Sequence, residues 1–279
     1  MIAHSLKQVT LDHLKLNYYV SKRKKAKATL VLLHGMYNTH KLFYPLIEKL
    51  DNEFNIVALD LPGFGGSAAD EPFQPEQLPE LLHKFLARRK LPDIYLVGFS
   101  LGGTIGIEYA ARFPGTIKGL IIISAPTKTR YIGKLYLDLA ELAKSPEALK
   151  IMVSQKDSPL VQALVSFATA LPDVKYLKYH KADVVREIVS GTNYDAVSKY
   201  CRYLLDFDLA PQINMITVPI LAIYGGKDVA CLDKCAPEVS ALNPLAQVYT
   251  FPNFTHNAQI NKTGLLSELV IEFCSGDRR

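Results

Sequence analysis

A serine at position 100 lies where nucleophilic chemistry is expected. The sequence Gly-Phe-Ser-Leu-Gly at residues 98–102 follows an apolar run and opens a segment with helical spacing. A serine on such a strand-to-helix turn is held on a sharp corner, and small residues are needed at Gly98 and Gly102 because strand and helix crowd together. The turn raises the Ser100 hydroxyl above the sheet and aims the free N–H of Leu101 at any negative charge forming nearby. An ordinary glycine-rich turn is the alternative, but both flanking segments fit the catalytic context.

A serine hydroxyl needs a base, because it is a poor nucleophile at neutral pH. The chain has seven histidines, and His256 is the candidate. It follows the last predicted strand, in the loop before the terminal helix. That places it at the carboxyl ends of the strands, on the same edge as Ser100, where open α/β sheets keep their sites.

The histidine in turn needs a carboxylate, which fixes its tautomer and supports its protonated form. Asp228 follows the predicted strand 219–224 by a few residues, again at the carboxyl edge. Asp206 and Asp208 precede that strand at its other end. Asp60 follows an earlier strand and more plausibly stabilises the glycine-rich loop of residues 61–66. The predicted triad is therefore Ser100, Asp228 and His256.

The elements that must position these residues follow from the apolar pattern. Short runs rich in Val, Ile and Leu alternate with segments of helical spacing, which predicts an α/β fold with a mostly parallel eight-stranded sheet covered by helices on both faces. The predicted strands are 9–11, 16–20, 29–33, 55–59, 93–97, 118–123, 219–224 and 247–251. The predicted helices of this core are 41–50, 75–89, 101–113, 235–242 and 263–273.

A long gap separates the sixth and seventh strands. It exceeds the roughly 30 residues that a strand–helix–strand crossover needs, and helical spacing recurs at 131–144, 146–155, 159–170, 182–189 and 194–205. We therefore expect a core of residues 1–126 and 208–279, with an all-helical cap of residues 127–207 inserted between strands six and seven. Its tyrosines, which either line an acyl pocket or pack the helices together, are Tyr131, Tyr136, Tyr176, Tyr179, Tyr194, Tyr200 and Tyr203.

These motifs resemble those of the α/β hydrolases, in particular the cap-bearing serine esterases and C–C hydrolases, over nearly the whole chain. The order serine, aspartate, histidine is that of this family and not of chymotrypsin or subtilisin. Residues 32–36, 60–67 and 217–228 are similar to its His-Gly loop, its next loop and its acid-bearing segment. The resemblance implies that the Met36 N–H is a second oxyanion donor beside that of Leu101. Thr255 departs from the family, which commonly has glycine there, and residues 36–40 lack the small residues often found after His-Gly.

Composition bounds the remaining possibilities. The chain has 279 residues, is 49% hydrophobic and carries a formal net charge of +5, which suits a globular protein and neither demands nor excludes an acidic partner. Its apolar runs are strand-sized, so we expect no membrane span, and we expect no signal peptide. The basic run 22–27 reads as an exposed turn, and we expect no nucleic-acid partner. The four cysteines lack metal or redox spacing, which favours reduced thiols in the cytoplasm.

The predicted function is that of a carboxylesterase acting on short- to medium-chain acyl esters, with small-molecule substrates and no metal or organic cofactor. The first alternative is a hydrolase of esters or thioesters on an acyl carrier protein, such as the pimeloyl methyl ester hydrolases of biotin synthesis. A loose basic cluster would suit that acidic partner; it comprises Lys175, Lys178, Lys181 and Arg186. A C–C bond hydrolase is a further alternative. A non-catalytic hydrolase-fold binding protein is disfavoured by the intact triad. The sequence leaves the oligomeric state open.

Overall fold

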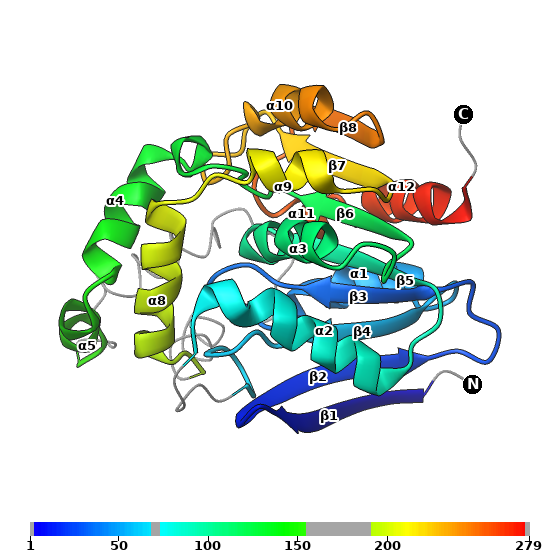
Figure 1. Ribbon diagram of the computed structural model, residues 1–279, viewed down its shortest axis with the longest axis horizontal. Helices are drawn as coiled ribbons and strands as arrows, with labels where there is room; N and C mark the ends of the chain where they lie inside the picture. The colour runs from blue at the N-terminus through cyan, green and yellow to red at the C-terminus, as the bar shows by residue number, and fades with distance from the viewer. Residues whose placement is uncertain (1–2, 68–72, 155–190, 277–279) are drawn as a thin grey trace.

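The computed structural model describes residues 3–67, 73–154 and 191–276, and these form an eight-stranded sheet with helices around it (Figure 1). The strand order is β1-β2-β4-β3-β5-β6-β7-β8. Strand β2 runs antiparallel to both of its neighbours, and the pairs from β4 to β8 are parallel. The prediction of a mostly parallel eight-stranded sheet is confirmed. In the described residues, no helix is long and apolar enough to cross a membrane.

The strands of the parallel region agree closely with the predicted ranges, whereas the opening hairpin is longer. Residues 5–8 of β1 are exposed, so no buried face marks them in the sequence. The hairpin turns at Asp12 and His13, which have φ values of 46° and 68°, as a tight two-residue hairpin turn requires. The eight strands are β1 (Ala3–Leu11), β2 (Leu14–Lys22), β3 (Thr29–Leu33), β4 (Asn55–Leu59), β5 (Ile94–Phe99), β6 (Gly119–Ile123), β7 (Ile220–Gly225) and β8 (Ala246–Phe251).

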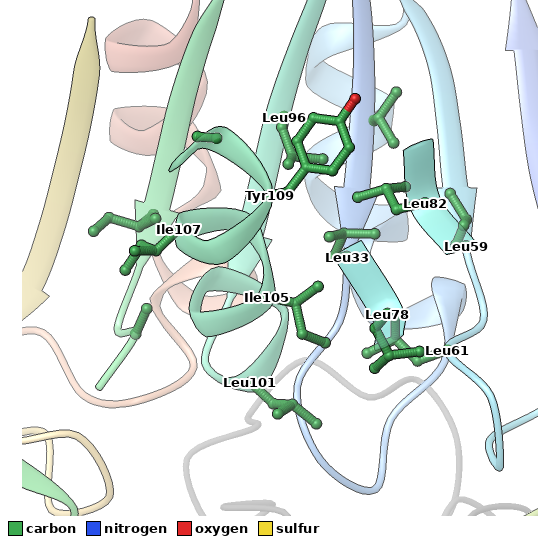
Figure 2. Packing of buried hydrophobic residues seen from close by; sticks show 14 of the residues in the cluster. Leu33, Leu59, Leu61, Leu78, Leu82, Leu96, Leu101, Ile105, Ile107 and Tyr109 are labelled. Carbon is green, nitrogen blue, oxygen red and sulfur yellow. The ribbon is translucent and has the colours of Figure 1, made fainter. Parts of the chain in front are cut away.

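Helices cover both faces of the sheet, because alternate residues of each buried strand point to opposite sides. Helices α1 (Tyr44–Leu50) and α12 (Thr263–Ser275) cover one face. Helices α2 (Leu78–Arg89), α3 (Leu101–Arg112) and α10 (Cys235–Leu242) cover the other, where Leu33 lies near Ile105 of α3 and Leu96 near Tyr109 (Figure 2). Burying one such leucine contributes about 1.5–3 kcal/mol. This packing fixes α3, and with it the turn at Ser100, against the sheet.

Two helices begin as tighter 3₁₀ turns, η1 (His40–Phe43) before α1 and η2 (Pro75–Gln77) before α2. The predicted helices 41–50 and 75–89 each included the 3₁₀ turn and the α-helix as one element. In each case a proline, Pro45 or Pro79, occupies the first turn of the α-helix. Proline has no N–H to donate to a carbonyl four residues earlier, so the α-helical pattern starts only just before it.

Between β6 and β7 the described residues form η3 (Thr129–Tyr131), α4 (Lys134–Ala143), α5 (Pro146–Ser154), α8 (Tyr194–Leu205) and α9 (Ala210–Met215). Helices α4, α5 and α8 lie together beyond one end of the sheet (Figure 1). Helix α4 starts later than predicted because Ile132 and Gly133 are extended and bond to the loop after β7: Ile132 forms a bridge with Cys231, and the Gly133 N–H donates to the Ala230 carbonyl at 3.0 Å. The helices predicted at 159–170 and 182–189 lie outside the described residues. Neither α9 nor the short α11 (Ala258–Asn261) was predicted.

Candidate active site

Ser100 occupies a strained turn between β5 and α3. Its φ of 52° and ψ of −122° lie outside the regions that side-chain-bearing residues ordinarily adopt. Backbone hydrogen bonds hold it there. The Ser100 N–H donates to the carbonyl of Ile123 at 3.0 Å, and the N–H groups of Gly103 and Thr104 donate to the Ser100 carbonyl at 2.9 and 3.1 Å. The geometry is therefore that of a sharp strand-to-helix corner, as the sequence pattern predicts.

The glycines around this corner are needed for close packing. A Cβ on Gly98 would lie 2.4 Å from the carbonyl oxygen of Gly102, and one on Gly102 would lie 2.1 Å from that of Leu33. Both clashes are with backbone, which cannot move aside without displacing a strand or helix. Sequence reasoning did not single out Gly103, where a Cβ would lie 2.4 Å from the Cβ of Ala125.

His256 and Asp228 form a direct pair. His256 Nδ1 donates to Asp228 Oδ2 at 2.8 Å, while Asp228 Oδ1 accepts the N–H groups of Ala230 and Cys231 at 2.9 and 2.8 Å. The Asp228 side chain is fully buried, and that of His256 is 12% exposed. In the neutral ring, the hydrogen bond to the carboxylate places the proton on Nδ1, so the other ring nitrogen, Nε2, keeps its lone pair. No group in the described part of the chain occupies that nitrogen.

The pair lies beside the serine turn. The ring of His256 lies 4.8 Å, centre to centre, from that of Phe99, which directly precedes Ser100. The loop bearing Asp228 and the loop bearing His256 are also tied together, because the Lys227 N–H donates to the Phe254 carbonyl at 2.9 Å. Across the residues that the structure describes, no direct hydrogen bond joins Ser100 to His256. Such a bond is often long in a ligand-free site and tightens when substrate binds.

The loop after β3 lies against Ser100, since a Cβ on Gly35 would lie 2.9 Å from that of the serine. His34 fixes this loop. Its Nδ1 donates to the Gly35 carbonyl at 2.7 Å, and its Nε2 accepts the Leu61 N–H at 2.9 Å. Burial lowers the pKa of His34 to about 4, so the ring is neutral. In a trans peptide the C=O and N–H point in opposite directions, so holding the Gly35 carbonyl also orients the Met36 N–H.

Two backbone N–H groups next to the serine are free to bind an anion. These are the N–H of Met36 and that of Leu101, the first residue of α3. Among the described residues, neither donates to any acceptor. Free N–H groups at the start of a helix favour negative charge. The role of His34 in directing the first of them was missed at the sequence level, because its partner Leu61 is 27 residues away.

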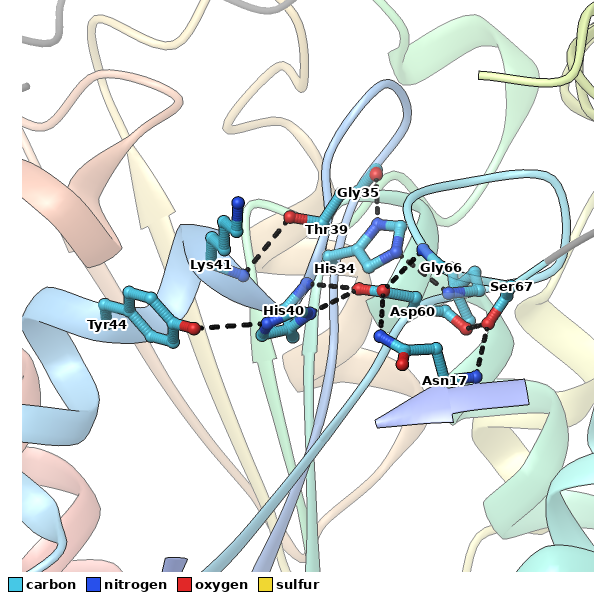
Figure 3. A network of polar contacts seen from close by, with 11 residues as sticks. Asn17, His34, Gly35, Thr39, His40, Lys41, Tyr44, Asp60, Gly66 and Ser67 are labelled. Atoms are coloured by element: carbon cyan, nitrogen blue, oxygen red, sulfur yellow. Dashed lines mark hydrogen bonds and ion pairs between the residues drawn. The ribbon is translucent and has the colours of Figure 1, made fainter. Parts of the chain in front are cut away.

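Asp60 stabilises the next loop, as predicted, through a buried network (Figure 3). Its Oδ1 accepts both the backbone N–H and Nδ1 of His40 at 2.7 Å, and its Oδ2 accepts Asn17 Nδ2 at 2.7 Å and the Gly66 N–H at 3.0 Å. Burial raises the pKa of Asp60, but the hydrogen bonds and charge of the neighbouring histidines outweigh it and lower the pKa to about 2. The Asp60 carboxylate is therefore ionised, and its hydrogen bonds stabilise the loop.

Helix α8 and the residues before it are joined to this loop. The Gly65 N–H donates to the Gly191 carbonyl and the Asn193 N–H to the Gly63 carbonyl, each at 2.8 Å. From α8, the hydroxyl of the buried Tyr200 donates to the Pro62 carbonyl at 3.0 Å. Likewise, Tyr203 donates to Glu108 of α3 at 2.8 Å. These two tyrosines therefore pack and anchor α8 against the core.

The segment leading into α4 is joined to the loop that bears Asp228. The Leu232 N–H donates to the Tyr131 carbonyl at 2.9 Å, and the Gly133 N–H donates to the Ala230 carbonyl at 3.0 Å. Between these bonds, Ile132 and Cys231 form an isolated antiparallel bridge. The region between β6 and β7 thus contacts the loops on both sides of the candidate site.

The fold and the site together define the class of this protein. The family model described as the alpha/beta hydrolase fold matches residues 28–263, and the chain belongs to this family. The resemblance inferred from the sequence motifs is therefore confirmed.

Particular relatives extend the comparison. The chain is 26% identical over 265 residues to the pimeloyl-[acyl-carrier protein] methyl ester esterase of Edwardsiella ictaluri (strain 93-146), covering 90% of this chain and 94% of that protein. It is 23% identical over 278 residues to epoxide hydrolase 3 of Xenopus tropicalis, covering 93% of this chain and 75% of that protein. The solved enol-lactonase from Burkholderia xenovorans LB400 matches with a TM-score of 0.75 at 20% identity, over 96% of this chain and all of that one, which shows the shared fold.

Proposed function

We propose that this protein is a serine esterase that forms an acyl-enzyme on Ser100, with His256 as the base and Asp228 as the residue that orients it. The observation that carries the proposal is the 2.8 Å bond from His256 to a fully buried carboxylate, beside a serine on a strained corner. A histidine held this way has Nε2 available for the serine proton.

In the proposed reaction, Ser100 Oγ attacks the acyl carbon while His256 Nε2 takes the hydroxyl proton. The N–H groups of Met36 and Leu101 then stabilise the oxyanion of the tetrahedral intermediate. His256 returns the proton to the departing alcohol, leaving the acyl group on Ser100. Water then attacks the acyl carbon while His256 takes its proton, and the bond to Ser100 Oγ breaks as His256 returns that proton to Oγ and the acid is released. Every group in this scheme belongs to the chain, so no cofactor enters it.

For the substrate, we propose the methyl ester of an acyl chain carried on an acyl carrier protein, in preference to free short-chain esters. The support is the likeness to esterases named for that substrate, along nearly the full length of both chains. We further propose that residues 127–207 form a cap over the acyl chain and that the protein works in the cytoplasm, where its four free cysteines would stay reduced. The basic cluster expected to contact the carrier lies outside the described residues.

Labelling tests the nucleophile. A fluorophosphonate probe should modify Ser100, and Ser100→Ala should remove both labelling and ester hydrolysis without unfolding the protein. Ser124→Ala is the matched control, because Ser124 also follows a buried strand and has a positive φ of 49°. The control should keep full labelling. An adduct on another serine of active enzyme would refute the assignment.

A comparison of substrates tests the proposal that the acyl chain is bound to a carrier protein. The values of kcat/KM should be compared for p-nitrophenyl esters of increasing chain length and for the methyl ester of a carrier-bound dicarboxylic acyl chain. The rate on the carrier-bound ester should exceed the others and fall with salt, since exposed charges are screened within about 10 Å at 0.1 M. Rates on the small esters should barely respond to salt. Equal rates and equal salt dependence would favour a general carboxylesterase.

A further inference from the structure

Two of the four cysteines lie face to face beside the proposed catalytic acid. The Sγ atoms of Cys231, in the loop after β7, and Cys235, the first residue of α10, are 3.9 Å apart, and both side chains are buried. A disulfide has an S–S length of about 2.05 Å, so the sulfurs need to approach by about 2 Å. The two residues lie within a single turn of chain, since the Cys235 N–H donates to the Leu232 carbonyl at 3.2 Å.

The same loop residue also holds the carboxylate. The backbone N–H of Cys231 donates to Asp228 Oδ1 at 2.8 Å, and its backbone pairs with Ile132 in the segment that leads into α4. A movement of Cys231 therefore changes a hydrogen bond to the acid directly. Neither Cys201 on α8 nor Cys274 on α12 has such a connection to the site in the described structure.

We propose that Cys231 and Cys235 are a modification site, at which a hydroperoxide forms a reversible disulfide that lowers the activity by displacing Asp228. The regulatory part of this inference rests on the proposed function, in which Asp228 orients His256. The disulfide itself does not depend on it.

The chemistry balances with the hydroperoxide as the oxidant. The Cys235 thiolate attacks one peroxide oxygen and breaks the O–O bond, which gives a sulfenic acid and releases water or an alcohol once the leaving oxygen is protonated. The Cys231 thiol then attacks the Cys235 sulfur, forming the S–S bond and releasing water. The two thiols lose two electrons and the peroxide gains two. A thiol or a reduced dithiol reverses the step by exchange.

The surroundings favour Cys235 as the thiol attacked first. Burial raises the pKa of Cys235, but hydrogen bonds with Cys231 and Thr127 outweigh it and lower the pKa below its ordinary value. For Cys231, burial raises the pKa. Peroxide reaches the buried pair when the short loop between Val229, which is 63% exposed, and Lys234 opens locally. The reaction should therefore be slower than that of an exposed thiolate.

The test uses the full chain, hydrogen peroxide as the oxidant and trypsin for mapping without reduction. Cleavage after Lys234 separates the two cysteines, so a disulfide would join peptide 228–234 to peptide 235–262. We expect this linked pair to appear with peroxide, ester hydrolysis to fall 10- to 100-fold, as a misplacement of about 1 Å can cost, and dithiothreitol to reverse both changes. Cys235→Ser should keep its basal activity and resist peroxide, whereas the matched control Cys274→Ser should remain sensitive.

Two results would overturn the inference. The first is the absence of the linked pair in wild-type protein at peroxide concentrations that oxidise Cys274. The second is a linked pair formed in full yield with unchanged activity. Peptide mapping requires no catalysis and no variant, so a missing linkage refutes this inference alone. A missing fluorophosphonate adduct on Ser100 would instead refute the proposed function and leave the disulfide standing.

Discussion

The described residues include two histidine–aspartate pairs with a buried carboxylate and nearly the same geometry. His256 Nδ1 donates to Asp228 at 2.8 Å, and His40 Nδ1 donates to Asp60 at 2.7 Å. They differ at the other ring nitrogen. His40 Nε2 contacts the Tyr44 hydroxyl at 3.2 Å, whereas His256 Nε2 has no partner in the described part of the chain.

The aspartates differ as well. Asp60 binds a side-chain amide and two backbone N–H groups besides the His40 ring, and these link a strand, a 3₁₀ turn and a loop. Among the residues that the structure describes, Asp228 binds only its own loop and His256. The comparison teaches that a short histidine–carboxylate bond does not by itself indicate catalysis. What distinguishes the proposed site is a free second nitrogen beside a serine.

The largest effect should come from Asp228→Asn. The amide oxygen can still accept the two loop N–H groups, so the fold should survive. Its nitrogen, however, forces His256 into the wrong tautomer, which costs about 10⁴ in kcat. Kinetics on a p-nitrophenyl ester measure this. Asp208→Asn is the control, because Asp208 pairs with Lys128 away from His256, and it should lower kcat little. The reverse outcome would contradict the assignment of the acid.

The free energy of unfolding should depend on pH through His34, which, unlike His256, has both ring nitrogens in hydrogen bonds. Its pKa is lowered by burial to about 4 in the folded chain, while an unfolded histidine takes up a proton near pH 6.5. The unfolded state therefore binds more protons between these values, and stability falls as the pH drops from about 6.5 to about 4, by about 3 kcal/mol. Urea unfolding across this range measures it. The slope should be smaller in His34→Gln, and an unchanged slope would argue against a neutral buried ring.

Asp60→Asn should separate the two pairs. Because an amide cannot accept all four hydrogen bonds that the carboxylate accepts, at least one buried donor loses its partner, which costs about 1–3 kcal/mol. The free energy of unfolding should fall by that amount, while kcat should change by less than about tenfold. Chemical denaturation and ester kinetics on the same sample measure both. A loss in kcat as large as that of Asp228→Asn would show that the pairs are not functionally distinct.

The smallest effect should be that of Tyr44→Phe, which frees His40 Nε2 and makes the two pairs more alike. The 3.2 Å contact is partly exposed, so its loss should cost less than about 1 kcal/mol of stability. The kcat should be unchanged, since His40 has no nucleophile beside it in the proposal. Thermal unfolding and kinetics test both statements, and a new hydrolytic activity independent of Ser100 would break the comparison.

The parts of the site that sequence could predict are local. The Ser100 corner needs only a strand, a glycine-rich turn and a helix in succession, and Asp228 and His256 follow from the positions of two strands. The role expected for Asp60 also came from its place before a glycine-rich loop. In each case the information lies within about ten residues along the chain.

The parts that were missed depend on distant partners. Tyr203 could equally have lined a pocket, and only its bond to Glu108, 95 residues away, shows that it anchors α8. The start of α4 depends on the bridge between Ile132 and Cys231, a residue of the loop after β7. The starts of α1 and α2 were also predicted wrongly, although Pro45 and Pro79 could have indicated them, because the effect of proline on a helix is local.

The backbone conformation of Ser100 lowers the stability of the fold. A residue that carries a side chain at such dihedral angles costs about 1–3 kcal/mol, a penalty that glycine largely avoids. If Ser100 is the nucleophile, as proposed, a copy of this gene released from the need for that reaction would gain stability by exchanging its serine for glycine at this corner. The less stable residue at position 100 is therefore what selection for the proposed nucleophile, and not for folding alone, would retain.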